Sequence, residues 1–359
     1  MLSLYYNKFK EKDKMELEKQ VRIYNIDRPN SKKRMFDEQS GILNWNDISN
    51  NEYYDFLKTL RQKFWVPLEV SVVKDYSDWQ NKMSETEKKM FKRGVGILAS
   101  LDSVATVYDY HASQYIKDPA IKSLMAMIAY NETIHNESYS YVLSSIVSDE
   151  VASEVFNYPK EDPFMIKRNE RIMEELNEFI DNPTVTNFVK AQVANAVLEG
   201  VSFTNGFTPF YHLARNGKMF GMSEIIEYIQ AEEQIHSMVQ GTVVRDVLTQ
   251  YPEDNTEELA EWIYDFVKEI VLHEQEYCKD LYKDIDDIDM YEVIKYIEYR
   301  ANIILDNLGL SKIFDTKKNP MSWINAFDPQ NRNRKKEDFF EKREKNYELT
   351  SGDNGWDDL

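Results

Sequence analysis

Cysteine is almost absent from the sequence: Cys278 is the only one among 359 residues. A single cysteine excludes an intramolecular disulfide framework and a thiolate zinc site, and it is typical of a reducing compartment. Long hydrophobic runs are also missing, because charged residues interrupt every apolar stretch before the roughly 18 residues of a transmembrane helix. The N-terminal residues lack the apolar stretch of a signal peptide. We therefore predict a cytoplasmic chain that does not span a membrane.

Glycine and proline are scarce, with 11 and 10 residues respectively. The usual frequencies of about 7% and 5% would give roughly twice as many. So few helix breakers, together with abundant Leu, Ile, Met, Glu and Lys, predict long helices and an all-α fold. A chain of this length can bury a sizeable core without metal or disulfide cross-links.

Basic residues are too few to balance the acidic ones. The 44 Lys and Arg residues face 63 Asp and Glu residues, which gives a formal net charge of -19. A surface this acidic repels phosphate backbones, and this argues against nucleic-acid binding. The same surplus suits a chain that holds cations, although most acidic surpluses are only solvated surface.

Composition and helix-start signals divide the chain into three parts. Residues 1–50 are predicted to form an irregular N-terminal arm, residues 51–310 a helical bundle with a metal site, and residues 311–359 a flexible C-terminal tail. A capping box that begins at Ser84 and the pair Asp118-Pro119 mark two helix starts. Helices are expected over residues 53–63, from 84 onward, and over 119–146, 164–180, 183–214, 223–248, 256–282 and 290–308.

Two of the five histidines follow a glutamate by three residues, as Glu132-x-x-His135 and Glu233-x-x-His236. Residues three apart on a helix share a face, so each pair can place a carboxylate and an imidazole on one ion. The two pairs are 101 residues apart at both positions, which indicates internal pseudo-symmetry in a helical bundle.

Two further carboxylates, Asp102 and Glu199, stand inside apolar helical stretches. A buried carboxylate without a partner is costly, so both residues are expected to have one. Each precedes one of the Glu-x-x-His pairs, and the chain therefore repeats the order of a carboxylate helix followed by a Glu-x-x-His helix.

The four carboxylates and two neutral imidazoles carry a charge that balances two divalent cations. Ligation rich in oxygen, with one imidazole per ion, suits iron or manganese better than structural zinc. The pattern is typical of helical bundles with a di-iron or di-manganese centre, with Asp102 in place of one Glu. The alternative for each residue alone is structural: a buried hydrogen-bonded acid, or a surface Glu–His pair.

With these residues in place, the sequence resembles the small, radical-generating subunit of class I ribonucleotide reductase. The resemblance runs from about Trp45 to the C-terminus and includes residues beyond the candidate ligands. The segments that carry it are Leu101-Asp102-Ser103, Asn131 to Tyr139, Leu198 to Phe203, and Glu232 to His236. The resemblance implies a ferritin-like helical bundle that forms a homodimer.

In that family a tyrosine near the metal ions is oxidised to a stable phenoxyl radical, and the matching residue is Tyr139, one helical turn after His135. The residues at the family's positions around the radical are Phe203, Phe207 and Ile229. The resemblance therefore implies a dinuclear centre of Mn or Fe with a tyrosyl radical on Tyr139.

The resemblance also implies a path for the radical. Trp65 matches the tryptophan that begins the long-range path and is coupled to His135 through an acidic residue. That acid is Glu232 here, where the family normally has Asp. Tyr347, in the C-terminal tail, matches the residue that passes the radical to the large (alpha) subunit, on which the tail docks.

The Leu-Glu-Gly-Val-x-Phe stretch and the acidic tail that ends in Trp356 to Leu359 favour the class Ib branch. In that branch the centre is dimanganese, oxidised with a flavodoxin-like activating protein, or di-iron oxidised by O2. The implied activity is that of a ribonucleoside-diphosphate reductase small subunit, active only with the large subunit, which reduces ribonucleotides to deoxyribonucleotides. The alternatives are a dimetal oxidase or oxygenase with its own small-molecule substrate, a metal-storage protein, and a metal-free structural protein.

Overall fold

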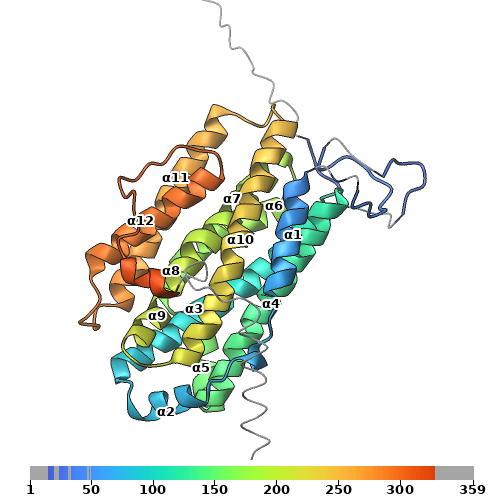
Figure 1. Cartoon of the computed structure of the whole chain (residues 1–359). Coiled ribbons are helices and arrows are strands. Elements are labelled where there is room, and N and C mark those ends of the chain that lie inside the picture. Colours follow the sequence, from blue (N-terminus) through green and yellow to red (C-terminus); the bar gives the residue numbers. More distant parts are fainter. Residues whose placement is uncertain (1–14, 20–23, 31–33, 47, 49, 328–359) are drawn as a thin grey trace, which may run out of the picture.

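The computed structural model describes residues 15–327 except 20–23, 31–33, 47 and 49, and its regular structure there is helical (Figure 1). The one pairing of extended backbone in this part is an isolated bridge between Glu16 and Thr184. No helix in the described ranges is long and apolar enough to cross a bilayer. The expected all-α, ferritin-like fold is confirmed.

The helices and their bounds are as follows. The α-helices are α1 (Asn51–Lys63), α2 (Val73–Asn81), α3 (Glu85–Ser113), α4 (Pro119–Ile146), α5 (Asp149–Glu161), α6 (Pro163–Asp181), α7 (Val185–Val197), α8 (Thr204–Gly206), α9 (Thr208–Arg215), α10 (Phe220–Gln250), α11 (Glu257–Leu281) and α12 (Met290–Asn307). Two short 3-10 helices, η1 (Pro67–Glu69) and η3 (Ser322–Phe327), and one π-helix, η2 (Leu198–Phe203), complete the set.

Local sequence signals account for the starts of the two central helices α3 and α4. The Ser84 side chain accepts from the backbone of Glu87, whose side chain returns to the Ser84 backbone, and so closes the predicted capping box. The Asp118 side chain accepts from two backbone N–H groups of α4, and Pro119 supplies the first helical residue. Helix α4 has the predicted bounds.

The core of the bundle consists of four helical segments: α3, α4, α10, and α7 with its continuation η2. Helix α3 packs on α4, and α7 packs on α10, which also contacts α4. Helices α6, α11 and α12 cover the α7 side, and α11 and α12 run side by side along one edge of the molecule (Figure 1). The two Glu-x-x-His helices, α4 and α10, therefore face each other across the interior.

Several elements differ from the sequence prediction. The single helix expected over 183–214 is divided into α7, η2, α8 and α9, because the backbone widens to π pairing at Leu198. Helices α2 and α5 were not predicted, and α5 contains Pro159 within its length. Helix α5 lies close against α3 at Gly96, where a Cβ atom would lie 2.6 Å from the Val155 carbonyl oxygen. Tertiary packing therefore stabilises a segment that the proline alone would argue against.

Residues 311–327, which the composition assigns to the tail, pack against the helical body. The Asn302 side chain donates to the carbonyls of Phe314 (2.8 Å) and Thr316 (3.1 Å). Phe327 stacks on Tyr211, with the ring centroids 4.8 Å apart. Met321, Ile324 and Phe327 are buried. The packed part of the chain therefore extends past residue 310, and the remainder of the predicted tail lies outside the described residues.

A buried arginine ties three helices together near one end of the bundle. Arg93 on α3 is 2.6 Å from Asp162, which caps α6, and 2.9 Å from Asp280 on α11. We predict that Arg93→Met lowers the free energy of unfolding by about 2–3 kcal/mol. Removing one partner of a buried pair costs roughly 3–5 kcal/mol, and both aspartates here keep some access to water.

Chemical denaturation of the purified chain tests this prediction. The matched control is Lys92→Met, which removes the neighbouring cation of α3 and its exposed pair with Glu154. The control is expected to change stability by no more than about 0.5 kcal/mol. Equal effects of the two variants would contradict the structural role of the buried pair.

Candidate metal centre

The structure brings all six predicted ligands together between four helical segments. Two groups have their ligand atoms within 4.8 Å of one another: Asp102, Glu132, His135 and Glu233, and Glu132, Glu199, Glu233 and His236. Glu132 and Glu233 belong to both groups. The cluster is therefore arranged as two four-residue sites that share two carboxylates, the layout expected for two ions bridged by glutamates.

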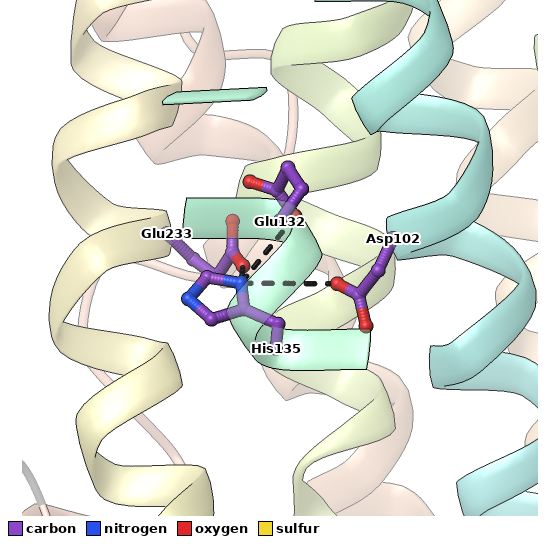
Figure 2. Close-up of side chains that lie close together, drawn as sticks. All are labelled: Asp102, Glu132, His135 and Glu233. Atoms are coloured by element: carbon purple, nitrogen blue, oxygen red, sulfur yellow. Dashed lines mark hydrogen bonds and ion pairs between the residues drawn. The ribbon is translucent and has the colours of Figure 1, made fainter. Parts of the chain in front are cut away.

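Each histidine directs its Nδ1 atom at carboxylates of its own site. Figure 2 shows the Nδ1 atom of His135 among three carboxylates. The distances from this atom are 2.9 Å to Glu233, 3.4 Å to Glu132 and 3.9 Å to Asp102. At the second site, the Nδ1 atom of His236 lies 2.7 Å from Glu132, 3.2 Å from Glu233 and 3.9 Å from Glu199. The two sites are thus related by the internal repeat that the spacing of the motifs predicts.

Helix geometry explains these positions. The three-residue spacing on α4 and on α10 places Glu and His on the same face, toward the interior. Asp102 comes from the middle of α3, and Glu199 from the π-helix η2. All six side chains are at most 1% exposed.

The buried polar atoms of the cluster are those that a pair of cations would satisfy. Both carboxylate oxygens of Asp102 and of Glu199 accept no hydrogen bond. Buried carboxylates of this kind require protons or cations. The donor set, oxygen-rich with two imidazoles, suits Mn or Fe. The residues therefore fit a dinuclear metal centre.

The electrostatics of the metal-free cluster lead to the same conclusion. Burial, and then the neighbouring carboxylates, raise the pKa of Asp102 and of Glu199 well above the usual value. Burial alone would lower the pKa of His135, but the adjacent Glu132 carboxylate raises it well above its usual value. The cluster therefore retains protons when metal is absent, and metal ions would displace them.

Tyr139 lies on α4, one turn after His135, and is fully buried. Its hydroxyl has no hydrogen-bond partner among the described residues. Burial, and then the negative charge of Asp102, raise the pKa of the phenol well above its usual value. The hydroxyl is thus neutral, dry and under the electrostatic influence of the cluster.

The three residues expected around the radical are also completely buried. Phe203 lies in η2 and Phe207 follows α8, and their rings stack with centroids 6.1 Å apart. Ile229 lies on α10, one turn before Glu233. Their assignment to the surroundings of Tyr139 stays a prediction.

A hydrogen-bonded chain leads away from the cluster on the far side of His135. The Nε2 atom of His135 lies 2.8 Å from Glu232 Oε2, and the Trp65 indole N–H donates to the same oxygen at 3.1 Å. The Trp65 ring also lies stacked beside the His135 ring. The longer Glu232 side chain therefore reaches both partners that an aspartate would have to join.

Several residues that contact this hydrogen-bonded path and the cluster were not predicted from the sequence. Asn131 donates to the second oxygen of Glu232 at 3.0 Å, and Tyr228 stacks on Trp65. Asp109 is a buried acid two turns after Asp102, and Gln240 donates to it. Burial, and then the charge of Glu132, raise the pKa of Asp109 to about 8. Only their positions in the sequence could have indicated these residues. Asn131 directly precedes Glu132, and Asp109 lies on the same buried face of α3 as Asp102.

Tyr347 and the acidic C-terminal end lie outside the described residues. Their predicted roles in docking and radical transfer stay predictions.

Comparisons with known proteins agree with the site. A family model described as "Ribonucleotide reductase, small chain" matches residues 42–320. The ribonucleoside-diphosphate reductase subunit beta of Halalkalibacterium halodurans is 36% identical over 352 residues, covering 96% of this chain and 100% of that protein. The corresponding protein of Treponema pallidum is 31% identical over 315 residues, covering 86% of this chain and 89% of its own length.

Solved structures give the same result. A putative class I ribonucleotide reductase from Bacillus halodurans has a TM-score of 0.76 at 35% identity and covers 78% of this chain and 100% of that one. The R2 subunit from Clostridium botulinum has a TM-score of 0.83 at 28% identity, with 87% and 99% covered. The dimanganese(II)-NrdF of Streptococcus sanguinis has a TM-score of 0.72 at 26% identity, with 80% and 99% covered.

The shared position of Glu132 gives a direct test of the centre. We predict that Glu132→Gln weakens Mn(II) binding by at least about 100-fold, because the residue belongs to both sites. The metal-free variant is expected to melt at a lower temperature than the parent chain, because His135 and His236 lose a carboxylate 3.4 Å and 2.7 Å away. Equilibrium dialysis and thermal melting measure the two effects.

Glu137→Gln is the matched control, because Glu137 is an exposed residue on the same helix. It is expected to change neither quantity. Unchanged Mn(II) affinity in Glu132→Gln, with a large loss of stability, would show that this carboxylate is a structural group.

Proposed function

The chain belongs to the ribonucleotide reductase small-chain family, and from this premise we propose that its cluster holds two Mn or Fe ions that generate a radical on Tyr139. The family match and the relatives that align along nearly the whole chain show the function of a ribonucleotide reductase small subunit. They favour this function over a dimetal oxidase with its own substrate. The observation that carries the proposal is the buried two-site cluster, with a buried tyrosine next to it and a hydrogen-bonded exit through Glu232.

We assign the ligands by the two sites. Asp102 and His135 would hold one ion, Glu199 and His236 the other, and the two shared glutamates would bridge them. When bound and oxidised, the metal ions supply the oxidising power that removes an electron from a nearby phenol. The donor set accepts either Mn or Fe. The structurally similar Streptococcus sanguinis protein is described as a dimanganese(II) form, which makes Mn the first metal to test.

The residues around Tyr139 would protect the radical. A phenoxyl radical persists only where water and oxidisable groups are excluded, and the Tyr139 side chain has no exposed surface. Phe203, Phe207 and Ile229 supply unreactive, apolar walls on η2, the segment after α8, and α10. The family resemblance at these positions supports their assignment.

The hydrogen-bonded path from His135 through Glu232 to Trp65 would carry the radical outward. His135 faces the metal site with Nδ1 and Glu232 with Nε2, so one imidazole connects the two. Glu232 can accept or return the proton at Oε2 when the indole is oxidised and reduced, while Asn131 holds the other oxygen. Tyr347 is proposed as the last residue of the path in this chain.

Reduction of ribonucleotides would take place on the large (alpha) subunit, with the C-terminal tail as its docking segment. We further propose a homodimer and, for a manganese centre, oxidation with a flavodoxin-like activating protein, as in the class Ib branch. The proposed location is the cytoplasm, in agreement with a single buried cysteine.

The radical assignment predicts a specific spectroscopic loss. Tyr139→Phe is expected to bind two metal ions normally but to give no tyrosyl signal in electron paramagnetic resonance (EPR) spectra. The samples are metal-free protein given Fe(II) and O2, and protein loaded with Mn(II) and oxidised with the activator. Tyr108→Phe is the control, because this tyrosine is also buried and its hydroxyl is also unpaired. A persistent tyrosyl signal in Tyr139→Phe would move the radical to another residue.

The exit path predicts a separation of radical formation from turnover. Trp65→Phe removes the N–H that Glu232 accepts, so the Tyr139 radical should form in normal yield while turnover with the large subunit falls by at least about 100-fold. Trp262→Phe on α11, a helix that supplies no residue of this path, should retain turnover. Normal turnover in Trp65→Phe would exclude the route through Glu232 and Trp65.

A further inference from the structure

Two arginines from different helices donate to the backbone of the π-helix that carries Glu199. Arg300 Nε on α12 donates to the carbonyl of Gly200 at 3.0 Å, and Arg168 Nη2 on α6 donates to the carbonyl of Ser202 at 2.9 Å. These carbonyls lie one and three residues after Glu199. The segment that presents one carboxylate to the cluster is therefore held by two cationic side chains.

The π-helix explains why such partners are needed. In a π-helix the backbone hydrogen bonds join residues i and i+5 instead of i and i+4. The hydrogen-bond pattern therefore changes at both ends of the π-helix, where α-helical pairing stops and where it resumes. Carbonyls at these shifts need partners outside the helix, because an unpaired buried carbonyl is costly. All residues of η2 are buried, so water is not available to supply them. The two guanidinium groups do so with charge-assisted hydrogen bonds.

Each arginine is itself fixed by the surrounding helices. Arg168 is fully buried and its Nε pairs with Glu274 on α11. Glu274 also accepts from the Ser202 hydroxyl at 2.6 Å and from the Asn205 side chain at 2.8 Å. The π-helix is thus tied to α6 and α11 through one ionic network.

Arg300 reaches its carbonyl because α12 lies very close to η2. A Cβ atom on Gly200 would overlap the end of the Ile304 side chain, one turn along from Arg300 on the same helix. The glycine therefore permits the close contact, and the arginine uses it to bond the backbone.

We propose that Arg300 and Arg168 are positioning residues that aim the Glu199 carboxylate at one of the two metal sites. This inference rests on the proposed dinuclear centre. Its distinctive consequence is asymmetry: Glu199 belongs only to the site with His236, whereas the site with Asp102 and His135 is built on α3, α4 and α10. Loss of the arginine contact should therefore weaken the binding of the ion held by Glu199 and His236 and leave the binding of the other ion unchanged.

A purely structural role for these arginines predicts something different. Arg93 is also buried, also joins three helices by ion pairs, and makes none of its ion pairs to η2. If the arginines only stabilise the packing of the helices, substitutions of Arg93 and Arg300 should affect metal binding in the same way.

The experiment compares full-length, metal-free Arg300→Met, Arg300→Lys and Arg93→Met with the parent chain. Mn(II) titrations followed by EPR give the number of ions bound and distinguish coupled ion pairs from isolated ions. Thermal melts of the same metal-free samples give the loss of stability. Arg300→Lys restores a donor that can reach the Gly200 carbonyl, but without the fixed planar geometry of the guanidinium.

We expect the parent chain and Arg93→Met to bind two Mn(II) ions as a coupled pair. Arg300→Met should bind one ion with near-parental affinity and the second at least 10-fold more weakly, and Arg300→Lys should recover part of that loss. Two tightly bound, coupled ions in Arg300→Met would overturn the inference and leave the metal centre intact. The inference would also be overturned if Arg93→Met and Arg300→Met both weakened the binding of the two ions equally, each in proportion to its fall in melting temperature. Failure of the parent chain to bind Mn(II) or Fe(II) would overturn the dinuclear centre itself.

Discussion

The burial of four carboxylates in one small volume is the constraint on which the rest of the structure depends. Like charges repel strongly where water is excluded, so such a cluster is tolerable only with protons or cations among the oxygens. Protonated histidines supply part of that positive charge in the metal-free cluster. Two divalent ions would balance all four carboxylates, with both imidazoles then neutral. The helices that carry the carboxylates are long and densely packed. This rigid packing keeps the acids together despite their electrostatic repulsion, whereas a flexible chain would move them apart.

His135 connects the carboxylate cluster to the hydrogen-bonded path that ends at Trp65. One ring nitrogen faces the carboxylates of the cluster and the other faces Glu232, so the imidazole orientation is fixed from both sides. Glu232 is one methylene longer than the aspartate that the family resemblance leads us to expect, and it still joins His135 to Trp65. Asn131 holds the free oxygen of this longer side chain. The added methylene is thus accommodated by a second hydrogen bond, and the carboxylate keeps both of its partners.

The π-helix shows how a departure from regular structure serves the site. Regular α pairing through Glu199 would engage the carbonyls to which Arg300 and Arg168 donate, and it would rotate the residues that follow to a different face. The buried carbonyls of the π-helix accept from arginines on α6 and α12, and Glu274 on α11 accepts from the Ser202 hydroxyl. These three helices supply none of the six proposed ligands. The outer helices therefore contribute to the geometry of the centre and not only to the size of the core.

Local sequence determined the helices with clear chemical starts and the identity of the candidate ligands. The Ser84 capping box, the Asp118-Pro119 start and the three-residue Glu–His spacing each depend on neighbours within one helical turn. Tertiary structure alone decided which glutamates are shared and that the backbone opens at Leu198. The link from His135 to Trp65 through Glu232 was expected from the family resemblance, and the structure gives its hydrogen bonds. These features depend on contacts between residues far apart in the chain. Helix α5 persists with Pro159 for the same reason, since packing against α3 outweighs a local preference that the sequence expresses plainly.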